Sequence, residues 1–171
     1  GYVTDDLVAH YSARAKGGVG LIVTEVVTVE PTYVYLPGDM SIYDDSFIPG
    51  WKKLVEGVHK YGTKILAQLF HPAFMAFPVP GTPQLIAPSN VGPYYAKSAP
   101  RPATIEELHT IVEQFGQAAH RVQLAGGDGV EIQCAHAHGL LGGFLTPLYN
   151  KRTDEYGGDI NGRMRLCLEV I

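Results

Sequence analysis

The feature that most constrains this chain is a repeated unit in which an amphipathic helix ends at glycine and an apolar strand follows at once. In the first unit Thr4 can cap a helix whose first turn carries Asp5 and Asp6, and the helical pattern stops at Gly17 and Gly18. Residues 19–26 are then almost continuously apolar and rich in β-branched side chains. Such a run is typical of a parallel strand that is buried on both faces.

Two further units repeat the pattern. Apolar residues from Trp51 to Val58 recur at helical spacing before Gly62, and residues 64–69 form the next predicted strand. Thr104 and Glu107 form a capping box for a third helix, which stops before a strand over residues 129–133, and a last helix starts near residue 161. Strands that alternate with helices predict a parallel α/β architecture, either a doubly wound sheet or a TIM barrel. Three strands do not distinguish the two.

The stretch between residues 72 and 102 is rich in proline, glycine and serine. It is too long for an ordinary connection, so we interpret it as an elaborated functional loop. The chain begins at a helix cap and ends inside a helical pattern at residues 166–171. We therefore expect residues 1–171 to be part of one domain, truncated at both ends.

Composition argues against several classes of protein. The net charge is -4 and the longest basic block is Lys52-Lys53, so no nucleic-acid partner is expected. The two cysteines, Cys134 and Cys167, form no CxxC motif and favour a reducing, cytoplasmic location. No apolar run approaches the roughly 20 residues needed to cross a bilayer, so no membrane association is expected.

In either parallel architecture the ligand lies at the carboxyl ends of the strands. Gln68 and His71 follow the second predicted strand, and Gln133, His136 and His138 follow the third. Carboxamides and imidazoles make a polar, neutral site that binds and polarises a ligand, and no pair of acids is ready for glycoside hydrolysis. Neither GxGxxG nor GxxxxGK[ST] occurs, so this segment offers no phosphate cradle.

The cluster of Cys134, His136 and His138 also suggests a zinc site. It supplies three ligands where a structural zinc site needs four. We therefore predict no metal.

Several motifs together carry a family resemblance. They lie, in chain order, at residues 17–25, 68–72, 129–132, 144–147, 150–158 (NKRTDEYGG) and 161–163. In these segments the chain resembles the old yellow enzyme family, in particular the branch of NADH:flavin oxidoreductases and 2,4-dienoyl-CoA reductases. The resemblance implies an FMN-binding TIM barrel, of which residues 1–171 would hold about the first half, with strands 2 to 4.

The resemblance also implies a chemistry. NADH or NADPH would reduce FMN, and the reduced flavin would pass hydride to the activated C=C bond of a small α,β-unsaturated substrate. A 4Fe-4S cluster and FAD would belong to a C-terminal part outside this chain, and the protein could be a homo-oligomer. Two alternatives stay open: a degenerate, non-catalytic barrel fragment that binds no flavin, and a barrel enzyme with a phosphorylated substrate. The chain by itself is expected to be inactive.

Two residues match the family's cofactor positions. Gln68 matches the family glutamine that hydrogen-bonds the pyrimidine edge of the flavin. A carboxamide suits this role because it donates and accepts in one plane. Val26 lies where the family has a small residue whose backbone meets the flavin.

The family's substrate-binding pair can be placed in two ways. It consists of two donors three residues apart that hold the substrate's carbonyl oxygen. Alignment from residues 130–132 selects Gln133 and His136, whereas alignment from the Phe144 side selects Ala135 and His138. We favour Gln133 and His136, because a glutamine amide can still donate a hydrogen bond.

The chain also departs from the family. The His-x-Gly-Arg pattern is replaced at residues 71–74 (HPAF), and Gly139 is followed by Leu140 rather than by the tyrosine that can protonate the substrate's α-carbon. The charged residues of the last motifs match positions that are chiefly structural, so we expect a loop-stabilising network of Arg152, Asp154, Arg163 and Arg165.

Overall fold

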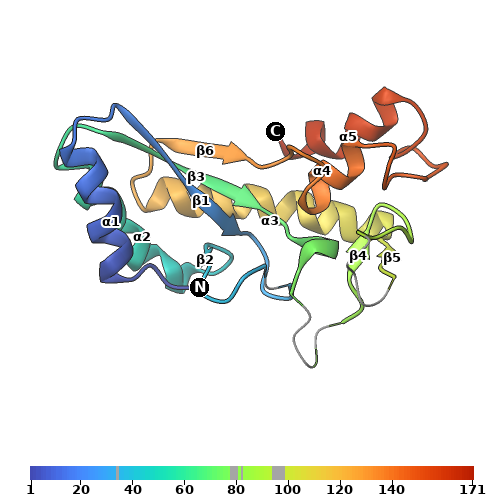
Figure 1. Ribbon diagram of the computed structural model, residues 1–171, viewed down its shortest axis with the longest axis horizontal. Helices are drawn as coiled ribbons and strands as arrows, with labels where there is room; N and C mark the ends of the chain where they lie inside the picture. Colours follow the sequence, from blue (N-terminus) through green and yellow to red (C-terminus); the bar gives the residue numbers. More distant parts are fainter. Residues whose placement is uncertain (34, 78–80, 82, 94–98) are drawn as a thin grey trace.

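The computed structural model describes residues 1–33, 35–77, 81, 83–93 and 99–171. Its main sheet has four parallel strands in the order β2 (Met40–Ser41), β1 (Leu21–Thr28), β3 (Lys64–Phe70) and β6 (Gly129–Ile132). The long strands therefore lie side by side in chain order, and their carboxyl ends meet at one edge (Figure 1). This confirms the predicted parallel α/β architecture.

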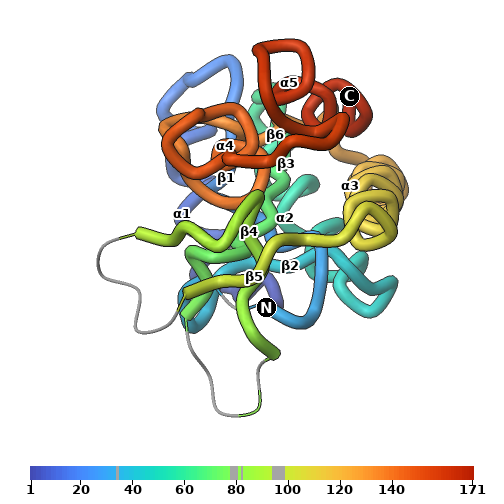
Figure 2. Tube along the Cα trace, turned by 90° about the vertical axis from the view of Figure 1, so that its right-hand side faces the viewer, coloured from blue at the N-terminus to red at the C-terminus, as the bar shows by residue number. Residues whose placement is uncertain are grey.

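The long helices lie on one side of this sheet. α1 (Asp5–Lys16) packs on α2 (Ile48–His59), α2 packs on α3 (Ile105–Leu124), and α3 lies next to α5 (Ile160–Val170) (Figure 2). The short α4 (Gly139–Leu145) follows β6 and packs on α5. Strands in chain order with helices on one face are the arrangement of part of a TIM barrel, because a doubly wound sheet carries helices on both faces.

Two of the helices, α1 and α3, begin at the caps seen in the sequence. Thr4 accepts a hydrogen bond from the Leu7 amide, and Thr104 and Glu107 form the expected capping box of α3. Asp159 caps α5 by accepting from two backbone amides, so that helix starts at residue 160. Within the described residues no helix is both long and apolar enough to cross a membrane.

The core lies between the sheet and the helices. Every second residue of the strands points toward it, as Ile22, Ile65 and Leu69 do. The helices contribute Trp51, Leu54, Val58, Leu108 and Phe115, all nearly inaccessible to solvent. Each such side chain stabilises the fold by about 1.5–3 kcal/mol relative to an exposed position.

The prediction that the first strand is buried on both faces is wrong for this chain. The strand runs from residue 21 to 28 rather than from 19 to 26, and Leu21 and Val23 remain 49% and 36% exposed. They point to the face that carries no helices. In a barrel this face is covered only when further strands curve round to close it.

The stretch between residues 72 and 102 contains three short elements that sequence reasoning missed. A 3-10 turn, η2 (Ala73–Met75), is followed by β4 (Ile86–Ala87) and β5 (Arg101–Pro102), which form a separate parallel pair. They lie beyond the carboxyl ends of the main strands (Figure 1). Residues 78–80, 82 and 94–98 of this stretch lie outside the described residues.

The NKRTDEYGG motif has a structural role in this chain. Arg152 donates hydrogen bonds to the carbonyls of Pro88 and Ala103 and pairs with Asp154. Asn150 donates to the carbonyls of Phe144 and Tyr156. The motif thus ties α4 to the β4–β5 pair, and the predicted loop-stabilising network is confirmed. Arg163 and Arg165 add further bonds, to the carbonyls of Leu145 and Glu155.

Candidate active site

A cavity of about 790 Å³ lies at the carboxyl ends of β1, β3 and β6, on the face without helices. The five residues that the family resemblance assigned to the cofactor and the substrate all line it: Val26, Gln68, Gln133, His136 and His138. Its other lining residues are Tyr35, Glu131, Ile132, Cys134 and Ala135. Its volume is within the usual range for small-molecule sites.

A β-bulge places Val26 on this face. The register of β1 against β3 shifts between Val23 and Val26, so that Val26 pairs with Gln68, which in turn pairs with Glu131 of β6. Without the extra residue the strand's alternation would turn Val26 toward the helices. The amide of Glu25 in the bulge donates to the Tyr11 hydroxyl of α1. The bulge thus brings Val26, Gln68 and Glu131 onto one rung of the sheet.

Gln68 points from this rung into the cavity, and its side-chain amide donates a hydrogen bond to the Glu131 carboxylate. Its backbone amide donates to the Thr24 hydroxyl. The carboxamide is therefore held by Glu131 of β6, and the backbone of Gln68 is held by Thr24 of β1.

The turn after β6 brings Gln133 and His136 together. β6 ends at Ile132, and His136 and Ala137 have positive φ angles of 44° and 56°. The Nε2 atoms of Gln133 and His136 lie 3.2 Å apart. Gln133 is 7% exposed, and its Oε1 is buried without a hydrogen-bond partner among the described residues. The pair therefore places the Gln133 amide and the His136 imidazole next to each other, and Oε1 of Gln133 is still able to accept a hydrogen bond.

His138 has different partners. Its Nε2 lies 3.0 Å from the hydroxyl of Tyr35, and its ring stacks on Phe70. Partial burial, together with the nearby His136, lowers the pKa of His138, so its imidazole is neutral at pH 7. A neutral imidazole can accept a hydrogen bond from a phenol. Ala135, its partner in the second alignment, carries no polar side chain.

Sequence reasoning missed Tyr35. It lies in the loop after β1, 103 residues before His138, and no motif or periodicity marks it. The one available signal was an aromatic hydroxyl in a loop at the carboxyl end of a strand. Among the described lining residues it is the only hydroxyl in the cavity.

Gly139 allows the chain to turn directly after His138, between β6 and α4. Its φ is 61°, and a Cβ atom at this position would lie 2.3 Å from the Phe70 ring and 2.8 Å from the carbonyl oxygen of His71. The amide of Leu140 donates to that same carbonyl. Only glycine allows this close approach, which fixes the His138 end of the turn against β3.

The cysteine and histidines near β6 form no metal centre in the described part of the chain, where no three His, Cys, Asp or Glu side chains gather suitably. The cavity instead presents carboxamides and imidazoles, with one buried acceptor unpartnered. This set fits the edge of a planar heterocycle such as a flavin, which carries both N–H donors and carbonyl acceptors.

His71, the remaining polar residue after β3, does not line this cavity. It is 2% exposed, and burial lowers its pKa to about 3. In the unfolded chain an imidazole titrates near pH 6.5, so between that pH and about 3 the unfolded state binds one more proton. Stability should therefore fall as the pH drops through this window.

Because of His71, we expect the free energy of unfolding to be about 2 kcal/mol lower at pH 5 than at pH 7. Urea denaturation of the complete protein at both pH values measures it. The His71→Gln variant should lose this part of the pH dependence, whereas His120→Gln, at an exposed position of α3, should keep it. Equal pH dependence in His71→Gln and the unmodified protein would contradict the assignment.

The chain is similar to several known proteins. The profile of the NADH:flavin oxidoreductase / NADH oxidase family matches residues 1–171. An NADH oxidase from Thermoanaerobacter brockii is 39% identical over 173 residues, which cover the whole chain and 26% of that protein. An NADPH dehydrogenase from Listeria monocytogenes is 37% identical over 172 residues, again the whole chain and 49% of the relative.

Solved structures show the same fold. An Old Yellow Enzyme from Pichia sp. superposes with a TM-score of 0.90 at 34% identity, over 99% of this chain and 47% of that one. Morphinone reductase in complex with tetrahydroNAD gives a TM-score of 0.88 at 34% identity, over 95% and 49%. The chain thus spans about half the length of these structures, and between a quarter and a half of the curated relatives.

Proposed function

Because the chain belongs to the NADH:flavin oxidoreductase / NADH oxidase family, we propose that the complete protein is an FMN-dependent ene-reductase. It would take electrons from NADH or NADPH and add hydrogen across the activated C=C bond of a small α,β-unsaturated substrate. The observation that carries the proposal is the single cavity lined by Val26, Gln68, Gln133, His136 and His138. Residues 1–171 would then be part of the FMN-binding barrel domain.

Gln68 and Val26 would hold the cofactor. When bound, FMN accepts electrons from the nicotinamide and returns them to the substrate as hydride. The Gln68 carboxamide can donate and accept along one edge of the ring, and Val26 presents its main chain on the same rung of the sheet. A 4Fe-4S centre would need four thiolates and the chain has two cysteines, so at least two ligands of any such cluster would come from outside residues 1–171.

Gln133 and His136 would hold the substrate's carbonyl oxygen. Their Nε2 atoms are 3.2 Å apart, and the Gln133 amide can only donate in this contact. One substrate oxygen could accept from both residues once the Gln133 amide turns to it and His136 carries its proton on Nε2. Negative charge grows on this oxygen as hydride reaches the β-carbon. Two fixed donors in a partly buried site stabilise that charge more than they stabilise the neutral carbonyl, and so lower the barrier.

Tyr35 would protonate the substrate's α-carbon. Its hydroxyl lies 3.0 Å from Nε2 of His138, and the neutral imidazole would position it by accepting its hydrogen bond. After the transfer the tyrosinate would regain a proton from solvent. Tyr35 would thereby take over the role of the tyrosine whose usual place is occupied by Leu140. The reaction balances, because hydride adds to the β-carbon and the Tyr35 proton adds to the α-carbon.

The proposal is tested by product analysis with the purified complete protein. Incubation with NADH or NADPH and cyclohexenone should give cyclohexanone, with one nicotinamide oxidised for each molecule of product. Cyclohexanone offered as substrate should not be reduced, because it has no activated C=C bond. Oxidation of nicotinamide with no saturated product would contradict ene-reductase activity and leave only oxidase chemistry.

Gln68→Ala should weaken FMN binding roughly 5- to 150-fold in the complete protein. The reason is that the buried flavin edge loses a donor and an acceptor, which costs about 1–3 kcal/mol. The FMN dissociation constant, from titration of the apoprotein, measures the effect. Gln123→Ala, at an exposed position of α3, serves as the control. An unchanged constant in Gln68→Ala would remove this residue from the cofactor site.

A further inference from the structure

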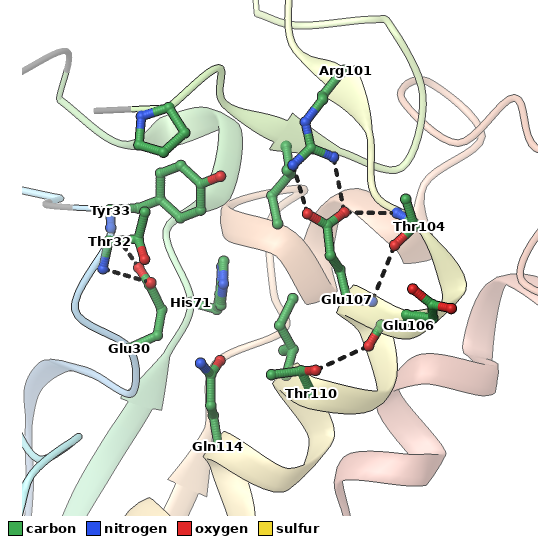
Figure 3. Close-up of a pocket in the computed structure, with 13 residues that line it drawn as sticks. Glu30, Thr32, Tyr33, His71, Arg101, Thr104, Glu106, Glu107, Thr110 and Gln114 are labelled. Carbon is green, nitrogen blue, oxygen red and sulfur yellow. Dashed lines mark hydrogen bonds and ion pairs between the residues drawn. The ribbon is translucent and has the colours of Figure 1, made fainter. Parts of the chain in front are cut away.

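A second cavity, of about 660 Å³, lies on the helix side of the sheet. Its walls come from the loops after β1 and β3, the β4–β5 pair and the first half of α3 (Figure 3). It shares no lining residue with the candidate active site. Nothing in the proposed ene-reductase reaction uses it.

Two buried polar atoms in this cavity have no hydrogen-bond partner among the described residues. They are Nδ1 of His71 and Oε1 of Gln114. Figure 3 shows the Gln114 amide pointing toward His71, with the Glu30 side chain beside them. His71 is 2% exposed and lines the cavity. Such unpaired groups are costly, by about 1–3 kcal/mol each, unless a bound molecule satisfies them.

The charges around the cavity favour a cation. The described lining residues include three carboxylates, Glu30, Glu106 and Glu107, against one basic side chain, Arg101. Arg101 is already engaged, because two of its nitrogens donate to Glu107. An anion would therefore meet two uncompensated carboxylates and no free cationic donor.

Glu30 is the buried carboxylate of this cavity, and it lacks a cationic partner among the described residues. It is 3% exposed and accepts hydrogen bonds from the backbone amides of Thr32 and Tyr33, at 2.7 and 2.6 Å, but no cationic side chain pairs with it in the described chain. Burial raises its pKa. A carboxylate has about four acceptor positions, so Glu30 retains capacity for another donor.

The amino end of α3 does not attract an anion here either. Its capping box uses Thr104 and Glu107 to satisfy the first amides, and Glu106 adds a negative charge in the first turn. The positive end of the helix is thus already compensated.

We propose that this cavity binds a small organic cation that carries several N–H donors, of the alkylammonium or guanidinium class. Such a group can donate to Glu30, to Oε1 of Gln114 and to the neutral imidazole of His71 together. The cavity volume is more than ten times the share of one water molecule in the liquid, about 30 Å³, so a single ordered water would not fill it. The site is independent of the flavin and its chemistry.

Isothermal titration of the complete protein with butylammonium and with methylguanidinium tests the proposal. At least one of the two should bind saturably, and the tighter one identifies the headgroup. Tetramethylammonium has the same charge but no N–H donor and should bind at least tenfold more weakly. Equal binding of tetramethylammonium, preferential binding of acetate, or no saturable binding of either cation in the millimolar range would each overturn the proposal.

Variants of Gln114 locate the binding. Gln114→Met removes the unpartnered oxygen at nearly constant volume and should weaken cation binding about tenfold, whereas Gln114→Glu adds a negative charge and should strengthen it. Gln117→Met, at an exposed position of the same helix, is the matched control. Thermal melting confirms that each variant is folded. Unchanged affinity in both Gln114 variants would show that the cation binds elsewhere and would contradict the assignment.

Discussion

Replacing His136 with alanine in the complete protein should slow hydride transfer to the alkene by about 10²–10³-fold, because the proposed site for the developing oxyanion loses one of its two donors. FMN binding and flavin reduction by the nicotinamide should stay close to those of the unmodified protein, since His136 and Gln133 form a pair separate from Gln68. Stopped-flow absorbance resolves the two half-reactions, with an enone as the oxidant.

The control for this variant is His120→Ala, at an exposed position of α3. It should leave both half-reactions unchanged. If His136→Ala left the reaction with the enone at its original rate, the Gln133–His136 pair would not hold the substrate oxygen. Loss of bound flavin in His136→Ala would instead assign this residue to the cofactor.

Tyr35→Phe should slow the same half-reaction by about 10²-fold or more, the usual contribution of a positioned general acid. The variant removes only the hydroxyl, and the T-shaped contacts of the ring with Phe70 and His138 can remain. Nicotinamide-dependent flavin reduction should be unaffected. Tyr33→Phe is the matched control from the same loop, because Tyr33 lines the other cavity.

The roles of Tyr35 and His138 are separated by comparing their variants. If His138 positions Tyr35, His138→Ala should be less harmful than Tyr35→Phe, since the hydroxyl is still present. If instead His138 holds the substrate oxygen, as the second alignment requires, His138→Ala should be the slower variant and His136→Ala should be mild. That ranking would overturn both the Gln133–His136 pair and the role of Tyr35.

The regular elements were predictable because their signals are local. Capping residues such as Thr4 and Thr104 and the glycines after each helix act within one turn, so they fix boundaries without tertiary information. The same reasoning placed Gln68, Gln133, His136 and His138 at one edge of the sheet, since parallel strands gather their carboxyl ends.

Other features depend on distant contacts and were not predictable. The bulge that turns Val26 into the cavity leaves no trace in an apolar run, and its amide partner, Tyr11, belongs to another element. The glycine-rich segment of α4 has poor intrinsic helix propensity. It forms a helix in a place where larger side chains do not fit, since a Cβ at Gly142 would lie 2.9 Å from the Ala135 carbonyl oxygen.

The continuous apolar character of the first strand has a related explanation. Its sequence carries apolar residues on both faces, but only the helix-facing side is buried in the described structure. The pattern matches the strand's place in a closed barrel, as in the solved relatives, of which this chain covers about half. Periodicity alone therefore predicted the architecture correctly and the exposure of Leu21 and Val23 incorrectly.

The most direct test of a flavin-dependent ene-reductase is the visible absorbance of the purified complete protein during one anaerobic cycle. We expect a flavin spectrum that bleaches when NADH or NADPH is added and returns when an enone is added, with both steps faster than the same reactions of free FMN. Two results would contradict flavin-dependent ene-reductase activity. One is a protein that is purified without flavin and stays colourless after incubation with FMN, and the other is a bleached flavin that the enone does not reoxidise.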